Sequence, residues 1–241
     1  MGRGVRMPKL EYKAGVFALT GICGLIDVAC FLALGGVFAE LMTGNLLLMG
    51  ITIGVDAFTW ARVAVYLSAI LPFCIGALAA GIMVNGTHRL GVRIIGYPVE
   101  FGAVVLATIL AVVFHPPALM LPGQFQSVDG HAIQRGVIVG LLAFAMGIHN
   151  ALMRKRGVPD IATNVMTLTL TGLVSESKLA GGPSTHWKRR LGSIVIFVCG
   201  AIAGAWLLQF HVAAPLIAAS VIFAFALWPL MRGRHEDPAT V

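Results

Sequence analysis

One acidic residue, Asp27, lies well inside an apolar stretch that is long enough to cross a membrane, about halfway along that stretch. Burying an unpaired carboxylate at such a depth costs several kcal/mol. The side chain must therefore be protonated, paired, or in contact with water or a cation. This pattern suits a coupling or selectivity carboxylate for a transported ion. The alternative is a structural Asp that bridges helices through a hydrogen bond.

A second polar pair, His149 and Asn150, lies inside another long apolar stretch. Imidazole titrates near neutral pH, so His149 would form a proton or cation relay with Asp27 if the two side chains face each other. Asp27 and His149 would alternatively be the acid and the base of a membrane-embedded enzyme. The chain has no HExxH, no GxSxG and no nucleotide-binding glycine loop. We therefore expect no enzyme, no cofactor and no metal site.

Two shorter apolar segments, 42–56 and 161–176, are rich in Thr, Asn and Gly. Non-helical backbone at membrane depth is tolerated only where it is buried in protein or lines a water-filled cavity. We predict that four side chains of these segments line a polar pathway, with interhelical hydrogen bonding as the open alternative. The four are Thr43, Asn45, Thr167 and Thr169.

The composition identifies the class of protein that positions these residues. Of the 241 residues, 58% are hydrophobic and 11% are charged, and the mean hydropathy is +0.90, outside the range of soluble domains. We predict an all-α membrane protein with six transmembrane helices and two short re-entrant or half-helices, in one polytopic domain over 1–241. The six stretches long enough to span are 14–38, 61–84, 95–114, 133–153, 191–210 and 213–231.

The basic residues favour this six-span arrangement. Loops on the cytoplasmic side carry an excess of Lys and Arg, and with six spans every basic cluster falls on one side while the connections 115–133 and 210–213 fall on the other. Both termini are then cytoplasmic. The net charge of +7 is spread over these loops rather than gathered in a patch, so we expect no nucleic-acid partner. The clusters are Arg3, Arg6, Lys9 and Lys13; Arg89 and Arg93; Arg154, Lys155 and Arg156; Lys178, Lys188, Arg189 and Arg190; and Arg232 and Arg234.

Three matches at nearly one offset predict an internal repeat. Residues 42–45 match 166–169 at an offset of 124, "FCIGALAAG" matches "FVCGAIAGA" at the same offset, and "GLID" at 24–27 aligns with "GIHN" at 147–150 at an offset of 123. Each half, about 14–114 and about 133–231, holds three spans, so the second half enters the membrane upside down. An inverted 3+3 repeat is typical of secondary transporters and of some channels.

The remaining acidic residues have simpler interpretations. Glu40 and Glu176 lie at helix ends, where they either guard an entrance or, as we favour, are solvated. Glu100 lies near the start of the third long span, and we expect its side chain to snorkel to the interface.

The four cysteines lie within apolar segments, without CxxC spacing and without a histidine at ligand spacing. We interpret them as small core residues rather than as disulfide or zinc ligands. They are Cys23, Cys30, Cys74 and Cys199.

The stretches "GLIDVACFLALGGVFAELMTGNLLLMG" at 24–50 and "MGIHNALMRKRGVPDIATNVMTLTLTGL" at 146–173 resemble the YoaK-like family of bacterial inner-membrane proteins, described as a domain of unknown function. The marks are Asp27, "MTGN" at 42–45, and Asn150 with the basic cluster and Thr-rich segment that follow it. Leu168 stands where the family often has Gly. The resemblance implies a multi-pass protein of the bacterial inner membrane and no defined mechanism.

These observations together predict a transporter or channel-like protein for a small solute or ion, embedded in the lipid bilayer, with monomer and homo-oligomer both left open. Asp27 would be its coupling or selectivity carboxylate, and the other polar residues would line its pathway. A non-catalytic membrane scaffold or assembly partner, in which the polar residues only join helices, is the principal alternative.

Overall fold

The computed structural model describes residues 10–55, 59–86, 95–114, 116, 130–156 and 166–232 of the chain. In these ranges the structure is mainly helical and contains no strand. The long helices are α1 (Leu10–Ala33), α3 (Trp60–Gly86), α5 (Tyr97–Phe114), α6 (Ala132–Arg156), α8 (Trp187–Leu207) and α9 (Ala214–Arg232), and the short ones are α2 (Met42–Gly54), α7 (Met166–Ser175) and the 3-10 turn η2 (Lys178–Ala180).

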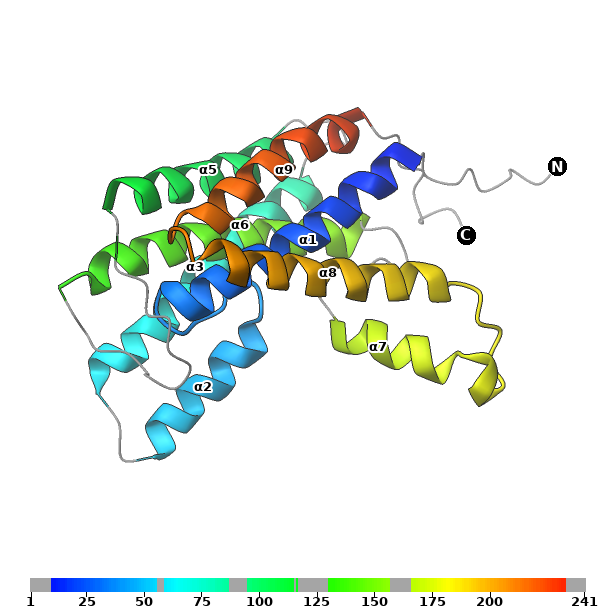
Figure 1. Cartoon of the computed structure of the whole chain (residues 1–241), viewed down its shortest axis with the longest axis horizontal. Helices are drawn as coiled ribbons and strands as arrows, with labels where there is room; N and C mark the ends of the chain where they lie inside the picture. The colour runs from blue at the N-terminus through cyan, green and yellow to red at the C-terminus, as the bar shows by residue number, and fades with distance from the viewer. Residues whose placement is uncertain are drawn as a thin grey trace.

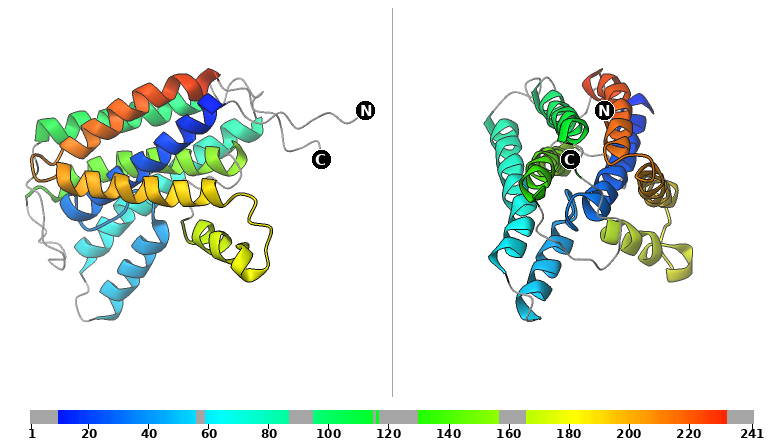
Figure 2. Two further views of the ribbon diagram at one scale, coloured as in Figure 1. Left: turned by 45° about the vertical axis from the view of Figure 1, so that its right-hand side comes forward. Right: turned by 60° about the vertical axis from the view of Figure 1, so that its left-hand side comes forward.

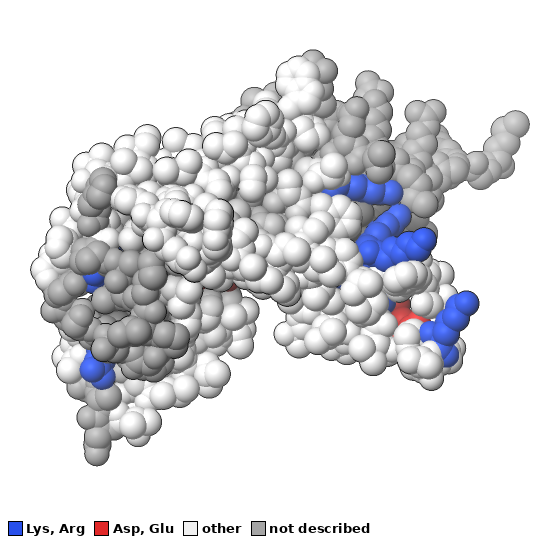
Figure 3. All heavy atoms as spheres, in the orientation of Figure 1, with Lys and Arg blue, Asp and Glu red and all other residues white. Residues whose placement is uncertain are grey.

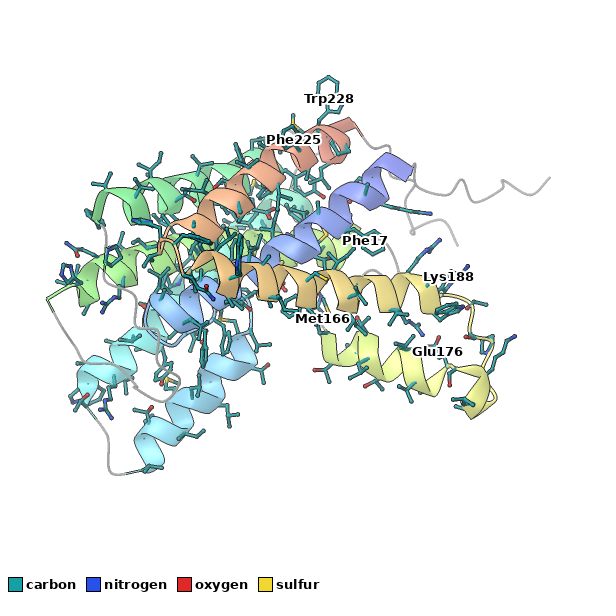
Figure 4. All side chains as sticks on the ribbon, in the orientation of Figure 1. Phe17, Met166, Glu176, Lys188, Phe225 and Trp228 are labelled. Carbon is teal, nitrogen blue, oxygen red and sulfur yellow. The ribbon has the colours of Figure 1, made fainter. Side chains whose placement is uncertain are left out.

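The six long helices lie side by side and run roughly along the longest axis of the molecule (Figure 1). All six are long and apolar enough to cross a membrane, as the hydropathy of the sequence predicts. Their outer faces carry large exposed apolar side chains; Phe225 and Trp228, for example, project away from α9 (Figure 4). Such faces suit a lipid environment, in which apolar surface needs no protein cover.

The first span is shifted toward the N-terminus from the predicted 14–38, because α1 begins at Leu10 and ends at Ala33 and not near residue 38. Residues 34–41 then form a non-helical loop whose side chains are mostly buried. Gly35 and Gly36 begin it with φ angles of 128° and 71°, in the region that only glycine adopts readily. The chain thereby turns back into the protein before α2 begins.

Four glycines bring the long helices into close contact in two pairs. A Cβ atom at Gly24 of α1 would collide with the backbone of α8, and one at Gly200 of α8 would collide with the backbone of α1. Gly147 of α6 and Gly76 of α3 are related in the same way. Small residues permit such close approach of helices in membranes, and the two contacts fix which helices are neighbours.

The helix contacts follow the predicted repeat. The alignment pairs Gly24 with Gly147 and Gly76 with Gly200, so the contact of α1 with α8 corresponds to that of α6 with α3. Likewise α1 packs on α9 as α6 packs on α5, and α2 packs on α3 as α7 packs on α8. The first helix of each half thus packs on the later helices of the other half. The inverted orientation in a membrane stays a prediction.

The short helices α2 and α7 extend from one flank of the bundle, toward its opposite ends (Figures 1 and 2). Their first turns approach each other near the middle of this flank, and the helices diverge from there. With 13 and 10 residues they are about 20 Å and 15 Å long, too short for a hydrocarbon core of about 30 Å. Of the predicted segment 161–176, residues 161–165 lie outside the described part of the chain.

Lys and Arg side chains gather mainly at the end of the molecule where α1 begins and α9 ends (Figure 3). Arg62 and Arg135 do not belong to the basic clusters named above. They lie in the first turns of α3 and α6, which start at the opposite end of the molecule (Figure 1). Most Lys and Arg side chains therefore lie at one end of the molecule, but these two arginines lie at the other.

The prediction that all four cysteines are core residues is half wrong. Cys23 and Cys30 of α1 are buried, whereas Cys74 of α3 and Cys199 of α8 are exposed on the outside of the bundle. Apolar periodicity did not separate the two cases, because a thiol is acceptable in lipid and in a protein core.

Candidate functional site

A cluster of buried polar side chains occupies the junction of α1, the loop 34–41, α5 and α6. Its acidic members are Asp27 of α1, Glu40 of the loop and Glu100 of α5, and His149 of α6 lies among them. Glu100 and His149 have no exposed surface, and Asp27 and Glu40 keep exposed fractions of 5% and 8%. The cluster thus lies where the first helices of the two predicted repeat halves, α1 and α6, touch.

Asp27 holds the loop against α1. Its Oδ1 accepts a hydrogen bond from the backbone N–H of Glu40 at 2.8 Å, and the backbone amides of Ala39 and Leu41 also interact with the carboxylate. Because these successive amides converge on one carboxylate, this end of the loop satisfies its donors within the protein. In the structure Asp27 therefore has the hydrogen-bonding role that the alternative interpretation gave it. The same hydrogen bond fixes the position of the Glu40 backbone.

Asn45 secures the other end of the same loop. Its side-chain oxygen accepts from the backbone N–H of Phe38 at 2.8 Å, and its side-chain nitrogen donates to the carbonyl oxygen of Phe38 at 2.8 Å. Gly44 leaves room for the Phe38 ring, since a Cβ there would lie 2.9 Å from two ring carbons. The ring in turn stacks on Phe31 at a centroid distance of 4.7 Å. The "MTGN" stretch is thus a clamp on a non-helical segment.

Glu100 pairs with His149 inside the bundle. Nδ1 of His149 lies 3.0 Å from Oε1 of Glu100, and both side chains are buried. The expectation that Glu100 snorkels to the interface is wrong, because α6 covers its side chain. Oε2 of Glu100 and Nε2 of His149 have no hydrogen-bond partner in the described structure, so each can accept a further ligand or proton.

Glu40 joins the two sides of the cluster. Its Oε1 lies 3.5 Å from Nδ2 of Asn150, a long contact, and its carboxylate, the Cys23 sulfur and a ring nitrogen of His149 lie within 4.8 Å of one another. The preferred interpretation of Glu40 as a solvated helix end is wrong. The loop carries its side chain inward, where Asp27 anchors its backbone.

Asp27 and His149 form no direct hydrogen bond in the part of the chain that the structure describes. Glu40 lies between them, since its backbone binds Asp27 and its carboxylate approaches His149. Among the described residues, no Lys or Arg forms an ion pair with any of the three acidic members. With every carboxylate ionised and His149 protonated, three negative charges would face one positive charge.

The threonines of the short helices lie apart from this cluster. Thr43 in α2 and Thr167 in α7 are exposed in the first turns of their helices, and Thr169 is buried where α7 packs on α8. Glu176, just after α7, is exposed and forms an ion pair with Arg190 at 2.8 Å, as expected for a solvated helix end. Thr43 and Thr167 therefore belong to the outer flank and not to the buried cluster.

Two members of the cluster, Glu40 and Glu100, were missed as site residues although the sequence contained a signal. Each stands close to a long apolar run, and the argument applied to Asp27 applies to any acidic residue near such a run. The deciding fact was the position of the helix ends. An α1 that ends at Ala33 returns Glu40 to the interior, and an α5 that is covered by α6 encloses Glu100.

Comparison with known proteins gives the family but no activity. The chain is 28% identical over 156 residues to the UPF0700 transmembrane protein YoaK of Bacillus subtilis (strain 168), a match that covers 64% of this chain and 61% of that protein. The chain thus spans about three fifths of the length of the curated relative it matches. No solved structure is significantly similar to it. With its six long apolar helices, the chain is a multi-pass membrane protein. A family model described as protein of unknown function (DUF1275) matches residues 15–228, so the chain belongs to that family.

Proposed function

We propose that this protein is a transporter or channel-like protein for a small cation, with the cluster of Asp27, Glu40, Glu100 and His149 as its binding site. One observation carries the proposal: three carboxyl groups and one imidazole are buried together in the bundle, and no Lys or Arg in the part of the chain that the structure describes forms an ion pair with the carboxyl groups. The proposal narrows the small solute or ion expected from the sequence to a cation.

The physical reason is charge balance. A buried charge must be paired, neutralised by a proton, or coordinated to a cation, because the low dielectric of the bundle does not screen it. In a purely structural core, apolar residues would fill the same volume at lower cost. A site that alternately binds a proton and a cation uses the surplus of negative charge.

The residues divide into two roles. Asp27 is a positioning residue, because its carboxylate holds the backbone that carries Glu40. Glu40, Glu100 and His149 are the groups with atoms left to bind an ion or to exchange a proton, since Nε2 of His149 and Oε2 of Glu100 have no partner in the described structure. Asn150 contributes an amide beside Glu40.

An entrance to the cluster is suggested by the flank that carries α2 and α7. Figure 3 shows a notch between the α2 and α7 ends of this face, with a small acidic surface at its inner end. Asp27 and Glu40 are the members of the cluster with exposed area. Thr43 and Thr167 stand in the first turns of α2 and α7, which approach each other on this flank. We assign these threonines to the approach, in a protein of the bacterial inner membrane with both termini cytoplasmic.

The experiment is a flux assay in liposomes that contain the purified protein and a trapped pH indicator. A cation gradient is applied, and the cations tested are Na⁺, K⁺, Mg²⁺, Mn²⁺ and Zn²⁺. We expect one of them to drive a proton counterflow in the wild type, which Glu100→Gln abolishes and Glu176→Gln retains, because Glu176 is exposed and outside the cluster. Absence of flux above that of empty liposomes for every cation, or equal flux in Glu100→Gln, contradicts the proposal.

The scaffold alternative rests on a specific observation, namely that Asp27 and Asn45 form hydrogen bonds to a buried loop. If the cluster only joins helices, Glu100→Gln keeps a hydrogen bond to His149, and the protein should be as stable as the wild type or more so. A folded Glu100→Gln variant that has lost flux separates the two proposals. Glu40 lies between Asp27 and His149, so these two residues do not meet as a direct acid and base pair; that the protein is not an enzyme stays a prediction.

A further inference from the structure

One group inside the cluster is not used by the proton and cation argument above, namely the thiol of Cys23. Cys23 lies near the middle of α1, one turn before Asp27, and only 1% of its surface is exposed. Its sulfur, a Glu40 carboxylate oxygen and a ring nitrogen of His149 lie within 4.8 Å of one another. The three atoms come from three different elements of the fold, so no spacing in the sequence relates them.

We propose that Cys23, Glu40 and His149 form a binding site for a divalent transition-metal ion of borderline softness, such as Zn²⁺ or Co²⁺. This inference rests on the proposed function for its role, since it names the class of cation that the cluster would carry. It replaces the expectation of no metal site, which depended on the lack of ligand spacing along the sequence.

The donor set selects the class of metal. A thiolate and an imidazole favour zinc and its neighbours in the first transition row, whereas Mg²⁺ and Ca²⁺ take oxygen ligands. Three protein ligands with a fourth position open are the arrangement of exchangeable and catalytic zinc sites, while structural sites have four. A transported ion needs such an incomplete shell, because it must leave again.

The geometry is close to what an ion requires. The three atoms lie within 4.8 Å of one another, and at that longest separation an ion equidistant from them would lie about 2.8 Å from each, compared with about 2.0–2.3 Å for zinc bonds to nitrogen, oxygen and sulfur. A shift of roughly 0.5–0.8 Å per side chain closes the difference. Glu40 is on a loop and Cys23 has one side-chain torsion angle, so small changes in torsion angles supply this shift.

Glu100 gives the histidine the orientation that a metal ligand needs. Nδ1 of His149 lies 3.0 Å from Oε1 of Glu100; with Glu100 ionised, Nδ1 carries the proton and donates it to the carboxylate. Nε2 then presents its lone pair, and it has no hydrogen-bond partner in the described structure. Metal-bound histidines very commonly donate their other N–H to a carboxylate in this way. Glu100 is therefore a positioning residue for the site.

The test is cobalt binding to the purified protein in detergent, in a background where the exposed cysteines Cys74 and Cys199 are Ser. Thiolate ligation produces a charge-transfer band in the near ultraviolet, which reports the Cys23 ligand directly and does not depend on transport. We expect this band at one ion per chain, its loss on addition of Zn²⁺, and its absence in Cys23→Ser. Cys30→Ser is the matched control, because Cys30 is buried in the same helix and outside the three ligands.

Glu100→Gln keeps all three ligands, so it tests the site even if Cys23→Ser fails to fold. We expect it to retain the band with an affinity about 10- to 100-fold lower. No band in the folded background protein, or a band of equal intensity in Cys23→Ser, overturns the metal site. A cobalt band without cation flux retains the site and refutes the proposed transport, whereas flux of another cation without cobalt binding refutes this inference alone.

Discussion

The clamp between Asn45 and Phe38 makes a quantitative prediction about folding. Asn45→Ala removes two hydrogen bonds of 2.8 Å and leaves a backbone N–H and a backbone carbonyl without partners. Asn45 has no exposed surface, so water does not replace the lost bonds. An unsatisfied buried polar group costs about 1–3 kcal/mol. Two such groups give an expected loss of about 2–6 kcal/mol in the free energy of unfolding.

The assay is reversible unfolding of the purified protein in mixed micelles by titration with SDS, followed by circular dichroism. The control is Thr43→Ala, which lies in the first turn of the same helix and is exposed. We expect this substitution to change the unfolding free energy by less than about 0.5 kcal/mol. If Asn45→Ala unfolds at the same SDS fraction as Thr43→Ala, the loop is not held as described, and the position of Glu40 loses its support.

Three further predictions test separate parts of the structure. Gly76→Ala should destabilise the protein by about 1–3 kcal/mol or more in the same titration, since its Cβ would collide with the backbone of α6. The control Gly81→Ala, with open space around it in the same helix, should be neutral or stabilising by about 0.5–1 kcal/mol. Equal effects of the two substitutions would exclude the close contact of α3 with α6. Asp27→Asn keeps an oxygen for the amide of Glu40, so the circular dichroism spectrum and the unfolding transition should remain. It removes one negative charge from the cluster, so liposome flux should fall, and unchanged flux would limit Asp27 to holding the loop. Glu176→Gln should change the free energy of unfolding by less than about 1 kcal/mol, because the carboxylate in its ion pair with Arg190 is exposed. A larger loss would mean that this end of α7 is buried in the membrane protein or in its assembly.

Much of the architecture follows from hydropathy alone. All six long helices were predicted close to their observed positions, because about 20 apolar residues have no other stable arrangement in a bilayer. The two short helices were also identified from their length. The end of α1 was not, because residues 34–38 are as apolar as the helix before them. Only the two glycines of the loop, with positive φ angles, mark the turn.

The candidate site was predicted only in part. Asp27, His149 and Asn150 were identified because a polar residue inside an apolar stretch is costly wherever it lies. Glu40 and Glu100 were assigned to interfaces, since a residue at the end of a span can face water or protein, and the choice depends on tertiary packing. The partner of each side chain cannot be read from spacing either, because the closest atoms belong to α1, a loop, α5 and α6.

The repeat shows how a sequence pattern and a structure inform each other. The alignment of Gly24 with Gly147, and of Gly76 with Gly200, was drawn from short matches at offsets of 123 and 124. In the structure the same glycines form equivalent contacts between helices of different halves. The alignment places Asp27 opposite Asn150, so the two halves contribute different side chains to one cluster.

The most direct test of the cation-binding claim is a transient current measured on a solid-supported membrane that carries the reconstituted protein. A rapid increase in the concentration of the transported cation should displace charge in the wild type and in Glu176→Gln. Glu100→Gln should need a cation concentration about 10- to 100-fold higher for the same displacement, because it keeps the three ligands and loses only the carboxylate that orients His149. A current in Glu100→Gln that equals that of the wild type, or no current in the folded wild-type protein for any cation tested, would contradict the account.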